Sequence, residues 1–256
     1  MKAKNKTNRF SVEKTEKNRT FFRWSSSLLL GLTFIFAVTA CSFTQQENSA
    51  SYIYLIRHGR TYSNEQELLV GRGGNYDLTE EAVSQAKAVG ETLAADGVDF
   101  DQAYSSTLGR AYDTATYILE GAGQETLEVQ QKADLDDISW GDAEGYTQEQ
   151  FMEEYHLETF PDAFGSADDA DFVSPIHAES KYDFCQRFDR GMSEIAEQMD
   201  AGDTVLVAAH SSIQFWLEQQ FPEVAGKGID NLGITILKVE GDEFQLVEYN
   251  TVLYNQ

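Results

Sequence analysis

Two histidines and two arginines stand where this sequence predicts strands to end or helices to begin. Arg57 and His58 follow the apolar run YIYLI, and His210 follows TVLVAA. Arg110 lies in the first turn of a helix expected after the strand that ends in YSS. Because the carboxyl ends of parallel strands meet at one edge of a sheet, we expect these four side chains to converge. Imidazole offers a nucleophile and guanidinium a forked donor, a combination that suits a tetrahedral phosphoryl group.

Strands and helices are expected to alternate through most of the chain. β-Branched and aromatic runs predict strands near residues 52–56, 100–106, 203–209, 233–240 and 243–249. Apolar spacings of three and four residues predict helices over 78–97, 107–121 and 180–202, with another helix directly after His210. This alternation predicts an α/β sandwich with a mainly parallel sheet, formed by one domain over residues 52–256.

Residues 148–178 interrupt this pattern. The segment is acidic, lacks helical or strand periodicity and holds two of the three prolines. It predicts a cap or insertion loop within the domain, and we expect the walls of any pocket to come largely from residues 148–180.

Five stretches in order resemble the motifs of the histidine phosphatase superfamily, in its phosphoglycerate-mutase-like branch. They are LIRHGRTYSN, YSSTLGRAYDTA, LDDISWGDAEG, HAES and VLVAAHSS, and the resemblance covers residues 52–250. The resemblance implies a three-layer α/β/α sandwich. It also implies that His58 becomes phosphorylated, and that Arg57, Arg110 and His210 form the phosphate pocket together with Asn64.

The resemblance also assigns an acid and a substrate contact. Asp137 falls where the family has its proton-donating glutamate, and Glu144 is the alternative acid because Asp137 is one methylene shorter. Arg72 falls where the family often has an arginine on the substrate side, so a peripheral substrate contact is expected. Three further positions depart from the family pattern: Arg60, Ala178 and Ser211.

The activity implied is metal-independent hydrolysis of a small phosphorylated substrate. The longer LNERHYG-like signature of the mutases is absent around Asp137, which favours water over a second hydroxyl as the phosphoryl acceptor. No Asp and His cluster has metal-ligand spacing, and no cofactor is expected. Two alternatives stay open: a surface binding protein that kept the fold with weakened catalysis, and a mutase-type phosphotransferase.

The first forty residues predict an export signal. Residues 1–24 carry eight Lys and Arg side chains, and the apolar stretch SLLLGLTFIFAVTAC follows. The tetrapeptide VTAC resembles the lipobox of bacterial lipoproteins, which implies cleavage before Cys41 and lipid attachment to its sulfur. Residues 41–51 would then form a polar tether to the outer face of the membrane. An uncleaved anchor helix, or an ordinary signal with an incidental cysteine, is the alternative.

The charge of the chain limits its partners. The formal net charge is −24, and removal of residues 1–40 takes away eight basic and two acidic side chains to leave −30. Such a surface repels nucleic acid and anionic lipid headgroups, so neither is an expected partner. A phosphate site in this chain therefore needs locally concentrated positive groups. The sequence predicts no particular oligomeric state.

Overall fold

The computed structural model describes residues 50–156, 164–241 and 243–254. The signal peptide, Cys41 and most of the tether lie outside the described residues, so the predictions for them stay predictions. None of the described helices has the length and apolar character needed to cross a membrane.

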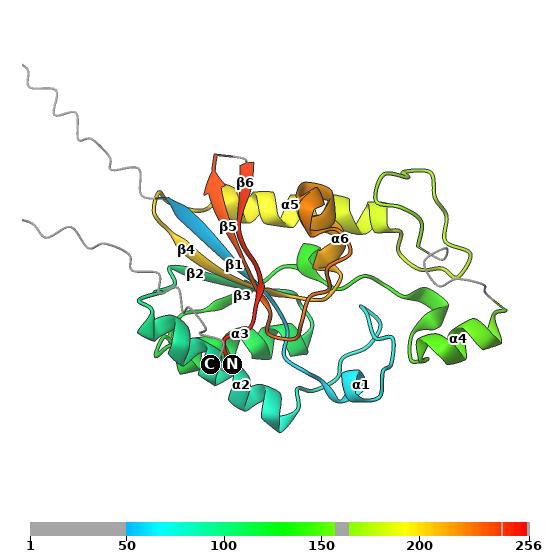
Figure 1. Cartoon of the computed structure of the whole chain (residues 1–256), viewed down its shortest axis with the longest axis horizontal. Helices are drawn as coiled ribbons and strands as arrows, with labels where there is room; N and C mark the ends of the chain where they lie inside the picture. Colours follow the sequence, from blue (N-terminus) through cyan, green and yellow to red (C-terminus); the bar gives the residue numbers. More distant parts are fainter. Residues whose placement is uncertain (1–49, 157–163, 242, 255–256) are drawn as a thin grey trace, which may run out of the picture. The chain divides into compact units, whose positions relative to one another are not determined.

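A mixed six-stranded sheet forms the centre of the domain, in the order β3-β2-β4-β1-β5-β6 (Figure 1). Its strands are β1 (Ser51–Arg57), β2 (Gln102–Ser105), β3 (Val129–Gln131), β4 (Thr204–Ala209), β5 (Ile234–Glu240) and β6 (Glu243–Thr251). The pairs β2–β3, β2–β4 and β1–β4 are parallel, whereas β5 pairs antiparallel with both β1 and β6. The five predicted strands are confirmed, and β3 adds a short sixth at the edge.

Helices cover both faces of this sheet, as Figure 1 shows. The helices are α1 (Tyr62–Glu65), α2 (Glu80–Ala95), α3 (Gly109–Gly121), α4 (Gln148–Glu154), α5 (Lys181–Glu197) and α6 (Ile213–Gln220). Short 3₁₀ turns occur at Ala133–Leu135, Gly141–Ala143 and Pro222–Val224. One buried cluster joins α5 and α6 to one face of β1 and β4, and another joins α2 and α3 to the opposite face. The three-layer α/β/α sandwich is therefore confirmed.

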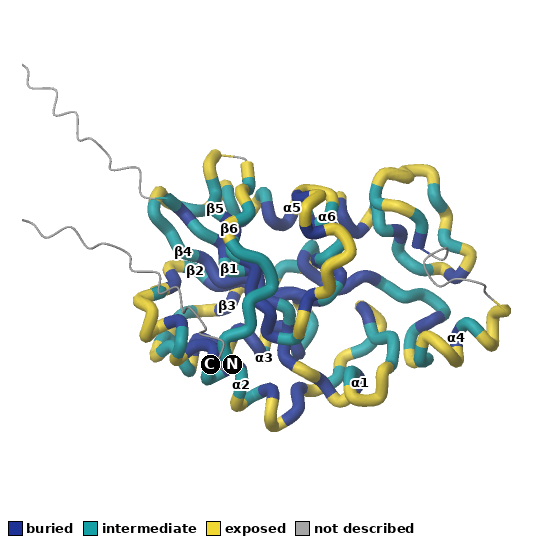
Figure 2. The backbone as a smooth tube through the Cα atoms, in the orientation of Figure 1, coloured by how far each residue is buried: buried dark blue, intermediate teal, exposed yellow. Residues whose placement is uncertain are grey.

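The central strands are apolar on both faces because both faces are covered. In β1, Ile53 and Leu55 belong to the cluster with α5 and α6, whereas Ile56 belongs to the cluster with α2 and α3. Figure 2 shows these strands as the buried centre between more exposed helices. Successive side chains of a strand point to opposite faces, so the run YIYLI supplies both layers at once.

Local signals explain where the long helices begin and end. The hydroxyl of Thr79 accepts a hydrogen bond from the amide of Ala82, which caps α2 as its position before two glutamates predicts. Gly97 follows the helix with φ of +84°, a conformation that glycine adopts without strain. Arg110 is the second residue of α3, in the first turn as predicted.

The segment 148–178 holds more structure than a loop. Thr147 and Gln150 form a reciprocal capping box that starts α4, and Phe151 on this helix is fully buried. Phe164 and Ile176 from the described remainder of the segment are also buried in the core on the α5 side of the sheet. The segment is therefore packed into the domain through these apolar side chains.

Candidate active site

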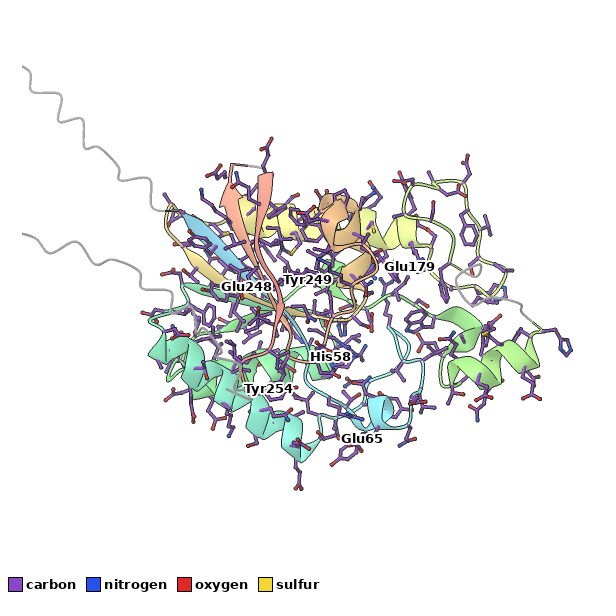
Figure 3. All side chains as sticks on the ribbon, in the orientation of Figure 1. His58, Glu65, Glu179, Glu248, Tyr249 and Tyr254 are labelled. Carbon is purple, nitrogen blue, oxygen red and sulfur yellow. The ribbon has the colours of Figure 1, made fainter. Side chains whose placement is uncertain are left out.

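The structure brings His58 and His210 side by side at the carboxyl ends of β1 and β4. Their ring centroids lie 5.2 Å apart with the planes inclined by 59°, and the residues are 3% and 0% exposed. The strand register pairs Arg57 with Ala209, and the amide of His58 donates to the carbonyl of Ala209 at 2.9 Å. Parallel pairing therefore places the residues that follow the two strands next to each other. Figure 3 marks His58 at this end of the sheet.

His58 is held as a neutral ring with one free nitrogen. Its Nδ1 lies 2.8 Å from the carbonyl oxygen of Gly59, which can only accept, so Nδ1 carries the proton and Nε2 keeps its lone pair. Burial, followed by electrostatic interaction with His210, Arg110 and Arg57, lowers the pKa of His58 well below its ordinary 6.5. At neutral pH the ring is therefore uncharged and able to act as a nucleophile.

His210 is held through its other nitrogen. Its Nε2 lies 2.7 Å from the hydroxyl of Ser106, and that hydroxyl also accepts from the amide of Leu108. This arrangement allows the hydroxyl to donate to Nε2, which leaves Nδ1 as a donor. Nδ1 is buried without a hydrogen-bond partner among the described residues and lies 3.6 Å from Oδ2 of Asp137. Burial, followed by the charges of three arginines, lowers the pKa of His210 well below 6.5.

The two predicted clamp arginines frame the histidines. Arg110 is 2% exposed and donates to the carbonyls of Gly71 and Gly74 and to Oδ2 of Asp137, so two of its five N–H groups remain uncommitted by these bonds. Arg57 donates from Nη1 to the carbonyl of Ile229, and its buried Nε has no partner among the described residues. Buried donors without acceptors are uncommon in proteins. A tetrahedral oxyanion would supply such acceptors.

The two candidate acids have different surroundings. Asp137 is 3% exposed and lines the same cavity as His58, with its carboxylate bound by Arg110 at 3.0 Å and by the hydroxyl of Ser212 at 2.6 Å. Glu144 instead accepts from backbone amides, including that of Gly71, and is not among the residues that line this cavity. The geometry therefore favours Asp137 over Glu144 as the group that faces a substrate.

Glu144 holds a turn that the active site needs. Its carboxylate accepts from the amides of Gly71 and Gly73 at 2.9 and 3.3 Å. The turn packs so closely that a Cβ atom at Gly71 would lie 1.9 Å from the carbonyl oxygen of Ile138. The same turn presents the carbonyl of Gly71 to Arg110. Glu144 thus supports Arg110, a predicted phosphate-binding residue, through the backbone of this turn.

A cavity of about 380 Å³ is lined by His58, Arg57 and Arg110, whereas His210 itself is not a lining residue. Asn64 lines it, and the Oδ1 of Asn64 accepts from the amide of Thr61, which leaves the amide nitrogen of Asn64 to donate elsewhere. Asn231 also lines the cavity, and its Nδ2 donates to the carbonyl of His58 at 2.9 Å. Cavities of this size suit small ligands.

Part of the cavity wall comes from residues 67–70, for which the sequence predicted no role. These are Glu67, Leu68, Leu69 and Val70, and Trp140, Arg60 and Ser211 also line the cavity. No described residue of 148–180 is among the lining residues, so the described wall differs from the one expected.

Arg72, the predicted peripheral substrate contact, has an exposed side chain outside the cavity lining. Its side chain is 42% exposed and its Nη2 lies 3.4 Å from Oε1 of Glu179. Arg72 is not a lining residue, so a contact with substrate stays a prediction.

Three polar residues at the site were missed in the sequence. Ser106 directly follows β2, and Ser212 lies two residues after His210. The signal that could have found them is a small hydroxyl side chain next to the end of a strand. Asn231 has no comparable signal, because only the fold brings it to His58. Among the described residues, no group of three or more His, Cys, Asp or Glu side chains is arranged to hold a metal ion.

Comparison with known proteins identifies the family. The sequence profile of the histidine phosphatase superfamily (branch 1) matches residues 53–252. The chain belongs to this superfamily. A 2,3-bisphosphoglycerate-dependent phosphoglycerate mutase of Mesorhizobium japonicum is 33% identical over 161 residues, which cover 62% of this chain and 76% of the mutase.

Solved structures of the superfamily share the fold. A phosphoglycerate mutase from Bacillus anthracis superposes with a TM-score of 0.70 at 22% identity, over 81% of this chain and 96% of that one. A mycobacterial glucosyl-3-phosphoglycerate phosphatase in complex with VO₃ superposes with a TM-score of 0.65 at 24% identity, over 78% and 98%. The phosphoglycerate-mutase-like fold is therefore confirmed. Both named activities occur among proteins of similar fold.

Proposed function

We propose that this superfamily member hydrolyses a small phosphomonoester through a phosphohistidine on His58. The observation that carries the proposal is the approach of His58 and His210 to 5.2 Å, with Arg57 and Arg110 beside them. Nucleophile, anion clamp and a candidate acid, Asp137, all border one cavity. Positive side chains placed around the transferring group stabilise the charge of its oxygens.

The first step is attack by Nε2 of His58 on phosphorus. The phosphorus–oxygen bond of the ester breaks as the nitrogen–phosphorus bond forms, and the leaving oxygen takes a proton from Asp137. Arg57, Arg110 and Nδ1 of His210 donate to the phosphoryl oxygens. In the second step water attacks the phosphohistidine and gives up a proton to the Asp137 carboxylate. Phosphate and the neutral His58 ring are released.

We also propose that the enzyme works outside the cytoplasm, attached through a lipid on Cys41. The motivation is the basic region, apolar run and VTAC tetrapeptide of residues 1–41. Two acyl chains would give a stable attachment. Metabolic labelling with a radioactive fatty acid should mark the wild-type chain and fail to mark Cys41→Ser, and labelling of both would refute lipid attachment at this residue.

The enzymatic proposal is tested by trapping the intermediate. Wild-type protein quenched in acid-free denaturant during turnover of a ³²P-labelled aryl phosphate should carry acid-labile phosphate, and His58→Ala should carry none and lose turnover. A binding protein would hold vanadate without becoming labelled. A mutase would move phosphate between substrate hydroxyls without net release, which a phosphate assay detects.

A further inference from the structure

Arg187, on α5, directs its guanidinium at the backbone that carries Asp137. Its Nη1 donates to the carbonyls of Asp134 and Asp136 at 3.0 and 2.7 Å, and its Nη2 donates to the carbonyl of Asp137 at 2.8 Å. The residue is 9% exposed, and its Nε and Nη2 pair with Oε1 and Oε2 of Glu179 at 2.6 and 2.8 Å. One side chain therefore binds three carbonyls of one short segment.

Glu179 holds the other side of the same segment. Its Oε2 accepts from the amide of Ser139 at 3.2 Å, and its own amide donates to the carbonyl of Ser139. The next residue, Ser180, caps α5 by accepting from the amide of Asp183, which fixes Glu179 at the start of that helix. Figure 3 marks Glu179 next to the beginning of α5. The ion pair thus binds the backbone both before and after Asp137.

This segment has no regular structure of its own to position a side chain. Residues 136–140 belong to no helix or strand, so their carbonyls need partners outside the backbone ladders. Asp137 is also one methylene shorter than the glutamate of the family pattern, so the backbone must bring the carboxyl group to the cavity. A charged fork with several simultaneous hydrogen bonds fixes such a position more firmly than single neutral bonds.

We propose that Glu179 and Arg187 are positioning residues for Asp137. Their ion pair sets the backbone from which this short carboxyl group reaches the leaving oxygen. The inference rests on the proposed function, because it takes Asp137 as the acid that protonates the leaving group. Glu179 belongs to the HAES motif, none of whose residues lines the cavity. The proposal therefore gives this motif an indirect role in the reaction.

The test compares two esters that differ in their need for an acid. Phenyl phosphate releases phenol, whose pKa is about 10 like that of the tyrosine side chain, so its departure benefits from an acid. In contrast, 2,4-dinitrophenyl phosphate releases a stable anion that needs no proton. Asp137→Asn serves as the reference for loss of the acid. We expect Glu179→Gln and Arg187→Lys to lower kcat/KM for phenyl phosphate about tenfold or more, and for the dinitrophenyl ester less than about threefold.

Arg190 provides a matched control on the same helix. Arg190 pairs with the side chain of Asp134 rather than with backbone carbonyls, and its side chain is 58% exposed. Arg190→Gln should change neither ester by more than about twofold. Thermal unfolding verifies that each variant is folded, and Glu179→Gln decides the test if Arg187→Lys does not fold.

Three outcomes distinguish failure of the positioning role from failure of the proposed function. Equal losses on both esters for Glu179→Gln would show a general structural role and overturn the inference. Absence of ester selectivity in Asp137→Asn would also overturn it, because there would be no acid to position. Failure of the wild-type protein to hydrolyse either ester would instead refute the proposed function.

Discussion

The ends of β1 and β4 carry equivalent histidines that are held in different ways. His58 donates from Nδ1 to the carbonyl of its own neighbour Gly59, an acceptor that no side-chain substitution removes. His210 depends on the hydroxyl of Ser106, which comes from a different strand end and can donate or accept. The proposed nucleophile is therefore fixed by local backbone geometry, whereas the ring of His210 is fixed by the assembled fold. Substitutions at or around His210 should therefore lower the activity by different amounts without removing the nucleophile.

The residues that follow the two histidines extend this contrast. The amide of Gly59 donates to the hydroxyl of Thr114, and a Cβ atom at Gly59 would lie 3.1 Å from the Cβ atom of Ala82 on α2. Gly59 therefore allows the backbone after His58 to pack closely against α2. Ser211 lies instead on the cavity and has room for its side chain.

The largest effect that tests this contrast is expected at His210. His210→Ala removes a hydrogen-bond donor to the phosphoryl oxygens but leaves the proposed nucleophile, His58. We therefore expect kcat to fall about 10²- to 10³-fold, while His58 still becomes labelled, more slowly. Rapid-quench labelling measures this directly. Complete absence of label in a folded His210→Ala variant would show that the two rings do not divide the roles in this way.

A smaller effect is expected at Ser106. Ser106→Ala leaves Nε2 of His210 without its partner and allows the ring to change tautomer, so kcat should fall about tenfold. Ser106→Thr, which keeps a hydroxyl, is the matched control and should retain more activity than Ser106→Ala. Steady-state turnover of phenyl phosphate provides the measurement, and equal rates for Ser106→Ala and wild type would contradict a positioning role.

The smallest effect is expected on stability between pH 7 and pH 6. Because burial keeps both histidines neutral in the folded state while an unfolded histidine takes up a proton below about pH 6.5, the unfolded state binds more protons as the pH falls. The free energy of unfolding should therefore decrease on acidification, by less than about 1 kcal/mol per histidine over this range. Urea unfolding of wild type and His58→Gln at both pH values measures how much His58 contributes to the change in the free energy of unfolding. A steeper decrease in His58→Gln than in wild type would contradict it.

Much of the fold followed from signals that are local in sequence. Strands β1 and β4 are apolar runs, and α2 is bounded by Thr79 and Gly97, so these elements were predicted close to their observed limits. Strand β3 was missed because its three residues, VQQ, are mostly polar and belong to an exposed edge. Helices α1 and α4 were missed because they are short and depend on capping boxes rather than on an apolar stripe.

The residues of the site also differ in whether a local sequence signal predicts them. His58, His210 and the two clamp arginines were found because each follows a recognisable strand or starts a helix. The contacts of Arg187 with three carbonyls were not predicted, since nothing local in the sequence indicates which backbone segment its guanidinium reaches. The wall at Glu67–Val70 was missed because a short irregular segment gives no periodic signal, and only tertiary packing shows which side it presents.

The parallel pairing of β1 with β4 has a consequence for the timing of biogenesis. The nucleophile lies near the start of the domain and its companion ring near the end, and the register between the two strands is what joins them. A chain that has not yet formed this distant pairing has neither the anion cradle nor a fixed imidazole, so under the proposed function it has no activity during synthesis. Under that proposal, phosphoryl transfer begins only when the last third of the polypeptide has folded back onto the first.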